Sequence, residues 1–368
     1  MIAITNSQFF NEDLLVKGQT IFIEDGKINR ISNETVPEGY EIIDAAGDYV
    51  SPGFIDLQIY GSGGNLFSAY PTVGTLKQMD EDLMAKGTTG FLACVATNSP
   101  EVVYQCLDAA KDYRSEAKGF LGLHLEGPYI NPKRRGAHIE KYIYKASLEE
   151  VKRLLDYADG TVKMMTIAAE LQDEDVISYL VDQGMILSLG HSDADFNQAT
   201  SAYNNGFKTT THLFNAMPSI HHRTPNLPVA VMNHPTAMAS IIADGCHVDL
   251  EVVKMTYKAM KDRLFLITDA VTTCEIGPYQ HELRGDKFVT ADGTLSGSNI
   301  TLLQAVQNCV NHCDIPVEEA LKLATKNPAL LMGILSNKGT LNIGNDADLV
   351  FLTGDLQLKK VFVKGLHI

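Results

Sequence analysis

Three side chains in the middle of this chain are of the types that hold a divalent metal ion in a hydrolytic site. Glu126, His191 and His212 each stand at or near the end of a short apolar run. Two imidazoles and a carboxylate suit a borderline ion such as zinc and leave one coordination position open for water. Water on such an ion loses a proton near neutral pH and becomes a nucleophile for an amide carbonyl. These residues therefore predict metal-assisted hydrolysis.

A fourth residue, Asp269, ends the apolar run LFLITDA. A carboxylate beside the attacking water can accept its proton and return it to a leaving amine. The competing interpretation of Asp269 is a simple helix N-cap, and a lone strand histidine is more often a satisfied core residue than a ligand. The similar placement of all four residues, each after a separate run, favours a single site.

The elements that must position these residues are eight short apolar runs separated by amphipathic, helix-like segments. The runs cover residues 52–61, 88–97, 119–127, 162–170, 185–191, 208–217, 238–247 and 264–270. Alternating strands and helices predict a parallel sheet, and eight repeats predict a closed (β/α)8, TIM-like barrel. Helix starts are indicated by Ser99 before Pro100 and by Ser147 before two glutamates.

Polar residues gather at the C-terminal ends of these predicted strands. They are Gln58, Asn98, Glu126, Glu170, His191, His212, His247 and Asp269. Parallel barrel strands converge at that face, where barrel enzymes place their active sites. A polar exit to solvent accounts for one or two of these residues, but three histidines and several carboxylates favour a functional site.

The two ends of the chain differ from the middle. Residues 19–32 read as a hairpin around an Asp-Gly turn, and residues 338–365 have the same alternating character. Neither end is long enough for a core of its own, so we expect both to form one small β-sandwich. The expected division is 1–51 and 336–368 for the sandwich and 52–335 for the barrel.

Composition narrows the range of partners. The chain has 368 residues, 45% of them hydrophobic, and a net charge of −15. Such an acidic protein is not expected to bind nucleic acid or an anionic membrane, and an anionic substrate would need local positive charge. The six cysteines form no CxxC pair and are expected to be reduced thiols. Without a signal peptide or a membrane span, the protein is expected to be cytoplasmic.

Several strings resemble motifs of a known family. IDAAGDYVSPGFIDLQIYG resembles the barrel entry of the amidohydrolase superfamily. GLHLEGPYINPKRRGAH, LGHSDA, THLFNAM, ADGCHVD, LITDA and GTLSGSNITLLQAV resemble, in order, motifs of the N-acetylglucosamine-6-phosphate deacetylases. The resemblance extends to the C-terminal KGTLNIGNDADLVFL and so covers nearly the whole chain.

This resemblance implies an activity and a set of roles. The activity is hydrolysis of the acetamide of N-acetyl-D-glucosamine 6-phosphate to glucosamine 6-phosphate and acetate, in amino-sugar catabolism or cell-wall recycling. Glu126, His191 and His212 are the implied metal ligands, and Asp269 and His138 the implied catalytic residues. The implied substrate-binding residues are Ala137, His138, Asn215, Ala216, Arg223, Asp244, His247, Leu295, Ser296 and Gly297. The family also implies a homodimer in which Arg223 reaches the partner's site.

The chain departs from the wider superfamily at one position. Many members carry His-x-His at the end of the first strand and hold a second metal there, whereas this chain has Gln58 and Tyr60. Lys163 lies at the wrong end of its predicted strand to bridge two ions. One divalent ion per chain is therefore expected, with zinc favoured over Fe²⁺, Co²⁺ or Mn²⁺.

Other histidines and other functions remain as alternatives. His124 shares strand parity with Glu126 and is interpreted as core or supporting packing, while His221 and His222 lie in a predicted loop without an assigned role. The alternative substrates are another N-acetylated sugar phosphate, such as N-acetylgalactosamine 6-phosphate, an N-acetyl amino acid, or a cyclic amide. An inactive barrel that serves as a scaffold is the alternative outside enzymes.

Overall fold

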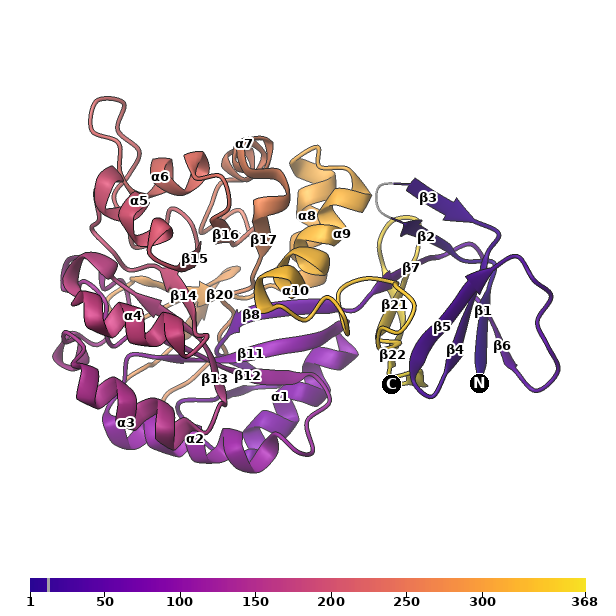
Figure 1. Ribbon diagram of the computed structural model, residues 1–368, viewed down its shortest axis with the longest axis horizontal. Coiled ribbons are helices and arrows are strands. Elements are labelled where there is room, and N and C mark those ends of the chain that lie inside the picture. Colours follow the sequence, from indigo (N-terminus) through magenta and orange to yellow (C-terminus); the bar gives the residue numbers. More distant parts are fainter. Residues whose placement is uncertain (12–13) are drawn as a thin grey trace.

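Eight parallel strands form a barrel at the centre of the larger part of the molecule (Figure 1). The structure, a computed structural model, describes residues 1–11 and 14–368. The strands are β8 (Phe54–Ile59), β11 (Thr88–Ala96), β12 (Phe120–Glu126), β13 (Val162–Ile167), β14 (Ile186–Leu189), β15 (Phe207–Thr210), β16 (Met238–Ile241) and β17 (Leu264–Leu266). Each pairs with the next in chain order. The backbone N–H of Tyr60 donates to the carbonyl of Ala270 at 2.9 Å and joins the last strand to the first. The predicted (β/α)8 barrel is confirmed.

Helices cover the outside of this barrel. They are α1 (Val73–Ala85), α2 (Pro100–Tyr113), α3 (Leu148–Ala158), α4 (Glu174–Asp182), α5 (Phe196–Asn204), α6 (Leu227–Asn233), α7 (Leu250–Met260), α8 (Leu302–His312), α9 (Val317–Ala324) and α10 (Lys326–Met332). The predicted start signals are correct in position: α2 begins at Pro100, and Ser147 Oγ accepts from the backbone N–H of Glu150 at the start of α3. Capping satisfies backbone donors that a helix end leaves unpaired.

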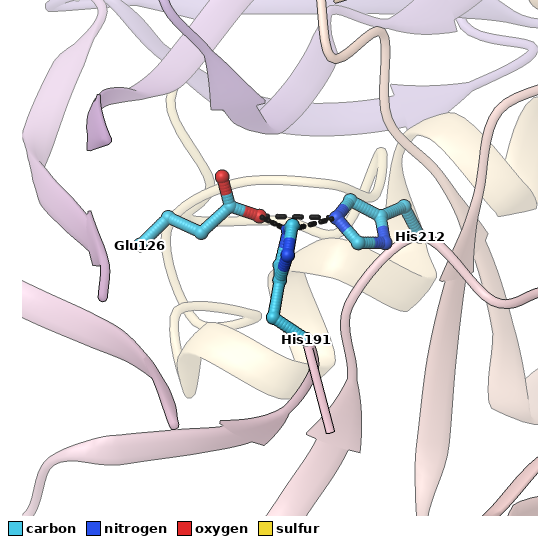
Figure 2. Close-up of side chains that lie close together, drawn as sticks. All are labelled: Glu126, His191 and His212. Carbon is cyan, nitrogen blue, oxygen red and sulfur yellow. Dashed lines mark hydrogen bonds and ion pairs between the residues drawn. The ribbon is translucent and has the colours of Figure 1, made fainter. Parts of the chain in front are cut away.

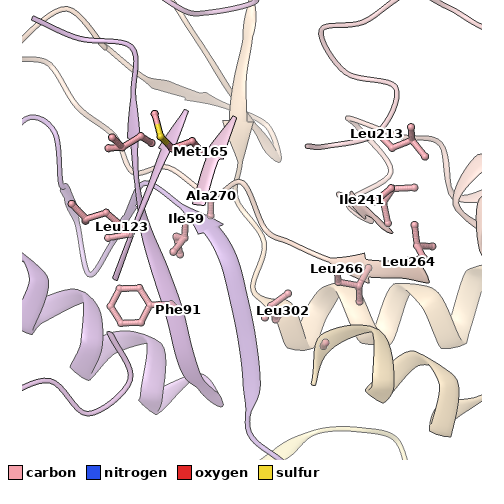
Figure 3. Packing of buried hydrophobic residues seen from close by; sticks show 14 of the residues in the cluster. Ile59, Phe91, Leu123, Met165, Leu213, Ile241, Leu264, Leu266, Ala270 and Leu302 are labelled. Atoms are coloured by element: carbon pink, nitrogen blue, oxygen red, sulfur yellow. The ribbon is translucent and has the colours of Figure 1, made fainter. Parts of the chain in front are cut away.

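Two apolar clusters stabilise the barrel. The larger lies between the strands and the helices, and Figure 3 shows part of it, including Phe91, Leu123 and Leu266. A second cluster fills the barrel interior, with Leu92 and Phe265 among its members. Strand side chains alternate between the two faces, so neighbouring residues of one strand can belong to different clusters, as Phe91 and Leu92 of β11 do.

A polar layer lies above the apolar interior, toward the C-terminal ends of the strands. His124 Nε2 lies 2.7 Å from Thr166 Oγ1, which lies 2.6 Å from Thr211 Oγ1. Ser188 Oγ lies 2.5 Å from the same Thr211 hydroxyl. These hydrogen bonds satisfy the buried hydroxyls, so this layer is a rigid support for the strand ends above it.

Two small sheets at the rim of the barrel were not predicted. The hairpin of β9 (Gly61–Ser62) and β10 (Asn65–Leu66) follows the first barrel strand. Between β17 and α8, the strands β18 (Glu282–Arg284), β19 (Lys287–Val289) and β20 (Leu295–Ser298) form an antiparallel sheet. Ser298 bridges Ala270, which places β20 against the segment that carries Asp269.

Both chain ends build the separate β-structure at the right of Figure 1. One sheet has the order β5-β4-β1-β6, from β1 (Ile2–Thr5), β4 (Thr20–Glu24), β5 (Lys27–Ser32) and β6 (Glu41–Asp44). The other has the order β23-β22-β21-β7-β2-β3, from β2 (Gln8–Asn11), β3 (Leu14–Lys17), β7 (Tyr49–Pro52), β21 (Leu349–Leu352), β22 (Leu358–Val363) and β23 (Leu366–His367). The predicted sandwich of both termini is confirmed, while its division at 52 and 335 stays a prediction.

The sequence-based expectations about membrane spans and cysteines can be compared with the described residues. No helix among them combines the length and the hydrophobicity that crossing a membrane requires. All six cysteines are free thiols, and five of them are buried, as expected for reduced core residues.

Candidate metal centre and active site

Glu126, His191 and His212 meet at the C-terminal face of the barrel (Figure 2). Glu126 ends β12, whereas the two histidines stand just beyond β14 and β15. His212 Nε2 lies 3.0 Å from His191 Nε2 and 3.1 Å from Glu126 Oε1. His191 Nε2 lies 3.3 Å from the same carboxylate oxygen, and all three side chains are buried. Three donor atoms from three separate elements thus form one compact triangle.

The triangle has the dimensions of a metal-ligand face. Zinc bonds to nitrogen and oxygen of about 2.0–2.2 Å place neighbouring tetrahedral ligands roughly 3.3 Å apart. One hydrogen bond fixes the tautomer of His191. Its Nδ1 lies 2.8 Å from the Arg134 carbonyl oxygen and donates to it. That bond leaves the Nε2 lone pair directed at the other two donors. The residues present therefore fit a divalent ion.

The backbone at this face is strained at the site residues. His191, His212 and Asp269 have φ values of 46°, 32° and 54°, in the left-handed region that side chains other than glycine rarely adopt. Such a conformation costs about 1–3 kcal/mol per residue and persists only where the surroundings enforce it. The three strained positions coincide with three of the four residues predicted to do the chemistry.

Gln58 and Tyr60 occupy the place where a second ion would need ligands. Gln58 Nε2 donates to Glu126 Oε1 at 3.0 Å and to Asp269 Oδ1 at 2.7 Å. The Tyr60 hydroxyl donates to Glu126 Oε2. An amide nitrogen and a phenol both act here as hydrogen-bond donors, so they orient the two carboxylates instead of binding an ion themselves.

The surroundings shift the pKa values of the two carboxyl groups of the site in opposite directions. Burial alone would raise the pKa of Glu126, but the imidazoles of His191, His138 and His212 hold it well below its usual range. Burial raises the pKa of Asp269 well above its usual range, against the opposing field of His212. Neighbouring carboxyl groups whose pKa values are pushed apart are typical of sites in which the two groups have different roles.

A pocket of about 250 Å³ opens above this cluster. It is lined by Glu126, His191 and Asp269 and by eight residues implied to bind substrate or assist catalysis: Ala137, His138, Asn215, Ala216, His247, Leu295, Ser296 and Gly297. Glu126 ends β12, and the other residues follow β12, β14, β15, β16 or β17 or belong to β20, so the barrel is what brings them together.

His138 is fixed on two sides at the edge of this pocket. Its Nε2 lies 3.1 Å from Glu126 Oε2, and its Nδ1 lies 2.8 Å from Thr97 Oγ1. The hydroxyl of Tyr279 donates to the carbonyl of the same Thr97 at 2.6 Å. Both ring nitrogens are thus engaged, and Nε2 is the one that faces the carboxylate ligand.

Other residues singled out from the sequence lie outside the pocket. Asp244 Oδ2 accepts from His247 Nδ1 at 2.7 Å, so it orients a pocket residue. Glu170 accepts from Asn131 and Ser192 in the loops after β12 and β14, and Asn98 lines a different cavity.

His124 is a core residue, as interpreted, because Leu57 O and Thr166 Oγ1 satisfy its two nitrogens. Lys163 lines a cavity at the N-terminal ends of the strands.

Arg223 also lies outside the pocket of its own chain. It is exposed on the segment between β15 and α6, which projects beyond the barrel in Figure 1. Its Nη1 lies 3.1 Å from His222 Nε2, and His221 Nδ1 accepts from the backbone N–H of Arg223 at 3.3 Å. The two loop histidines therefore shape the segment that carries the arginine.

Sequence reasoning missed part of the pocket wall. Tyr279 and His281, from the segment before β18, line the pocket, as do Ser68 and Thr294. Neither Tyr279 nor His281 belongs to a predicted strand or to a family motif, and their place depends on the small sheet at the rim. The one available signal was their position between the LITDA and GTLSGS strings, which both contribute to the same site.

The barrel, the donor triangle and the buried Asp269 define the class of this protein. The chain belongs to the amidohydrolase family, whose model matches residues 49–367. More narrowly, it is 31% identical to the N-acetylglucosamine-6-phosphate deacetylase of Bacillus subtilis, over 99% of this chain and 96% of that protein. The human enzyme of the same name is 33% identical, over 98% and 92%.

Solved structures agree with these sequence relationships. The N-acetylglucosamine-6-phosphate deacetylase of Pasteurella multocida superposes with a TM-score of 0.94 at 32% identity, covering 100% of this chain and 99% of that one. A mutant of the Mycobacterium smegmatis enzyme, in complex with N-acetyl-D-glucosamine 6-phosphate, gives a TM-score of 0.92 at 29% identity, over 100% and 98%.

Proposed function

We propose that this protein hydrolyses the acetamide of N-acetyl-D-glucosamine 6-phosphate and releases acetate and glucosamine 6-phosphate, as a step in amino-sugar catabolism. The observation that carries the proposal is the cluster of Glu126, His191 and His212 beside the buried Asp269, at the floor of a pocket of about 250 Å³. Deacetylases of this name match the chain over nearly its whole length.

In this proposal, one divalent ion is held by Glu126, His191 and His212. When bound, such an ion polarises an amide carbonyl and promotes ionisation of water. Zinc is the preferred ion for two imidazoles and one carboxylate, while Fe²⁺, Co²⁺ and Mn²⁺ accept similar donors. Gln58 and Tyr60 support a single ion, because both already donate hydrogen bonds to Glu126.

The chain's own residues divide the proton transfers of the reaction. Asp269 takes a proton from the attacking water, whose oxygen bonds to the acetyl carbon. His138 donates to the carbonyl oxygen as negative charge develops there. Asp269 then passes the proton to the amine nitrogen as the C–N bond breaks. Gln58, which donates to Asp269 Oδ1 at 2.7 Å, holds the carboxylate in place throughout.

The sugar and its phosphate require groups farther from the reacting bond. Asn215, Ala216 and His247 line the pocket on the side of β15 and β16, and Asp244 fixes the His247 ring. Leu295, Ser296 and Gly297 line it from β20, and Ala137 precedes His138. The described wall offers little positive charge for a phosphate. We therefore assign the missing cation to Arg223 of a second copy of the chain in a homodimer, because Arg223 is exposed on a projecting segment.

A substrate panel with metal analysis tests this function. We expect acetate release from N-acetylglucosamine 6-phosphate, a much lower rate on unphosphorylated N-acetylglucosamine, and one equivalent of metal per chain. N-Acetylgalactosamine 6-phosphate and N-acetyl amino acids complete the panel. Faster turnover of an N-acetyl amino acid, or full activity in protein that holds no metal, would contradict the proposal.

A further inference from the structure

We propose that His281 determines substrate specificity by hydrogen bonding to a ring hydroxyl of the amino sugar. This inference rests on the proposed function, since it assigns a residue to the recognition of that sugar. His281 lies just before β18. The sheet that β18 begins also contains β20, which bridges the segment of Asp269. No sequence motif had indicated a role for this residue.

His281 is held firmly in the pocket wall. Its backbone N–H donates to the Cys274 carbonyl at 2.9 Å, and the Cys274 N–H donates back at 3.2 Å. The ring Nδ1 lies 2.9 Å from Ser296 Oγ, and the ring stacks on Tyr279 with centroids 6.2 Å apart and planes at 16°. Fixed on both backbone and ring, this imidazole can select a ligand by geometry.

One polar atom of His281 is left for a ligand. Its Nδ1 is used by Ser296, whereas its Nε2 has no hydrogen-bond partner among residues 1–11 and 14–368. Although it has no partner among these residues, Nε2 is not sealed off inside the protein. The residue is only 5% exposed and lines the pocket, so the open side of its ring faces the pocket.

The chemistry of this atom favours a hydroxyl over the phosphate. Burial lowers the pKa of His281 to about 4, so the ring is neutral at neutral pH. A neutral imidazole has one donor and one acceptor nitrogen. A sugar hydroxyl can pair with Nε2 in either tautomer, because it both donates and accepts. A phosphate only accepts and is better matched by a cation, and no lysine or arginine is among the described residues that line this pocket.

Two substitutions separate the two nitrogens of the ring. His281→Asn places an amide near the position of Nδ1, which keeps the contact with Ser296 and removes the group that faces the pocket. His281→Gln extends an amide to the position of Nε2 and keeps the pocket contact. Both variants are measured with N-acetylglucosamine 6-phosphate and with its 1-deoxy, 3-deoxy and 4-deoxy analogues, as metal-loaded full-length protein.

We expect His281→Asn to raise KM about two- to tenfold with a smaller change in kcat, which is the range of one neutral hydrogen bond. His281→Gln should stay nearer the parent. One deoxy analogue should lose a similar factor with the parent enzyme and nothing further with His281→Asn, because both changes remove the same contact. The identity of that analogue names the hydroxyl.

The outcomes distinguish this inference from the proposed function. If every deoxy analogue loses the same factor with the parent and with His281→Asn, His281 contacts no hydroxyl and the inference is wrong. Equal losses for Asn and Gln, accompanied by equal drops in Tm, would show a merely structural role and also overturn it. A parent enzyme inactive on the phosphorylated sugar would instead refute the proposed function, and the inference with it.

Discussion

At the scale of single residues, Asp269 is where burial, backbone strain and chemistry meet. Its side chain accepts from Gln58 at 2.7 Å, and its backbone holds a φ of 54°. Asp269→Asn nearly preserves the shape of the side chain but cannot accept a proton. We expect it to keep its metal and to lose about 10²–10⁴-fold in kcat, the usual contribution of general acid–base catalysis.

Metal content and kcat measured on the same preparation check this expectation. His191→Ala serves as the comparison, since it should lose metal and activity together. A rate for Asp269→Asn within about tenfold of the parent would assign proton transfer to another group.

A second carboxyl, Asp56, predicts how stability depends on pH. It is fully buried beneath the site, where Thr268 Oγ1 donates to it at 2.5 Å, and burial raises its pKa from 3.8 to about 6. Between these values the folded chain keeps the proton and the unfolded chain releases it. The protonated Asp56 therefore stabilises the folded state fully below pH 3.8, and this stabilisation is lost as pH rises through about 6.

The shift corresponds to about 3 kcal/mol at most, from roughly 1.4 kcal/mol per pKa unit. The Asp56→Asn variant carries an amide that does not titrate, so it should lack this component. Urea unfolding of parent and variant from acidic to neutral pH measures it. The free energy of unfolding of the parent should fall relative to that of the variant as pH rises, and then run parallel above neutrality. A difference between the two that does not change with pH would contradict the assignment.

Residue types indicated the reacting centre well and its surroundings poorly. Glu126, His191, His212 and Asp269 were found because metal and proton chemistry restricts the usable side chains. The donors Gln58 and Tyr60 were noticed as departures, but their bonds to Glu126 depend on side-chain geometry. Tyr279 and His281 have no comparable chemical signature in the sequence, so their place in the pocket appeared only with the fold.

At the scale of elements, all eight barrel strands were predicted, because buried parallel strands form continuous apolar runs. Their ends were predicted less well. The predicted run 208–217 overlaps the short strand β15, Phe207–Thr210, and then turns through left-handed residues at His212, Phe214 and Ala216. Those conformations are imposed by packing at the rim, and local propensity does not encode them. The sheet of β18 to β20 was missed because its strands are only three or four residues long.

One residue of β20 shows how that sheet serves the site. Gly297 has a φ of 143°, and a Cβ there would lie 3.0 Å from the Asp269 carbonyl and 2.7 Å from Val271 Cγ1. Gly297→Ala should push β20 away from the segment of Asp269. We expect a loss of about 1–3 kcal/mol in stability, by overpacking, and a fall in kcat.

Gly285, in the turn between β18 and β19, provides a matched control. Its φ is 67°, but a Cβ there would meet nothing within 4 Å. Gly285→Ala should therefore carry only the smaller cost of a left-handed alanine, without a steric clash, and its kcat should match that of the parent. Thermal unfolding and kcat for both variants separate strain from displacement. Equal activities of the two variants would show that close contact with Asp269 is unimportant.

At the scale of the whole molecule, the chain ends form one core. Ile4, Ile21 and Phe9 from the N-terminal part pack with Leu349 and Phe351 from the C-terminal part. The ion pair Lys27–Asp346, at 2.9 Å, also joins the two ends. Truncation after Leu335 removes the C-terminal share of this core, and each large apolar side chain buried there contributes about 1.5–3 kcal/mol.

We therefore expect the truncated protein to be insoluble, as measured by the soluble fraction after expression. Phe351→Ala tests the same core in full-length protein and should cost about 3–5 kcal/mol in stability while leaving KM unchanged. A soluble, active truncation would show that the barrel folds without its sandwich.

The proposed homodimer is the largest scale at which the site is tested. Among the residues that the structure describes, no arginine lines the pocket, and Arg223 is exposed on the segment that projects beyond α6. A guanidinium gives a phosphate two parallel, charge-assisted hydrogen bonds. Arg223→Ala should therefore raise KM for the phosphorylated sugar by roughly tenfold to a hundredfold and barely change the rate on the unphosphorylated sugar.

Mixed dimers test whether Arg223 acts on the partner's site. In a heterodimer of Arg223→Ala and Asp269→Asn chains, the site that keeps Asp269 receives the intact arginine from the other chain. Random mixing should thus restore roughly one quarter of the parent activity, although each variant alone is poor. Arg114→Ala is the control, because that arginine is exposed and pairs with Asp159, away from the pocket. Equal losses of Arg223→Ala on both sugars would refute the phosphate role, and inactive heterodimers of verified composition would refute the shared site.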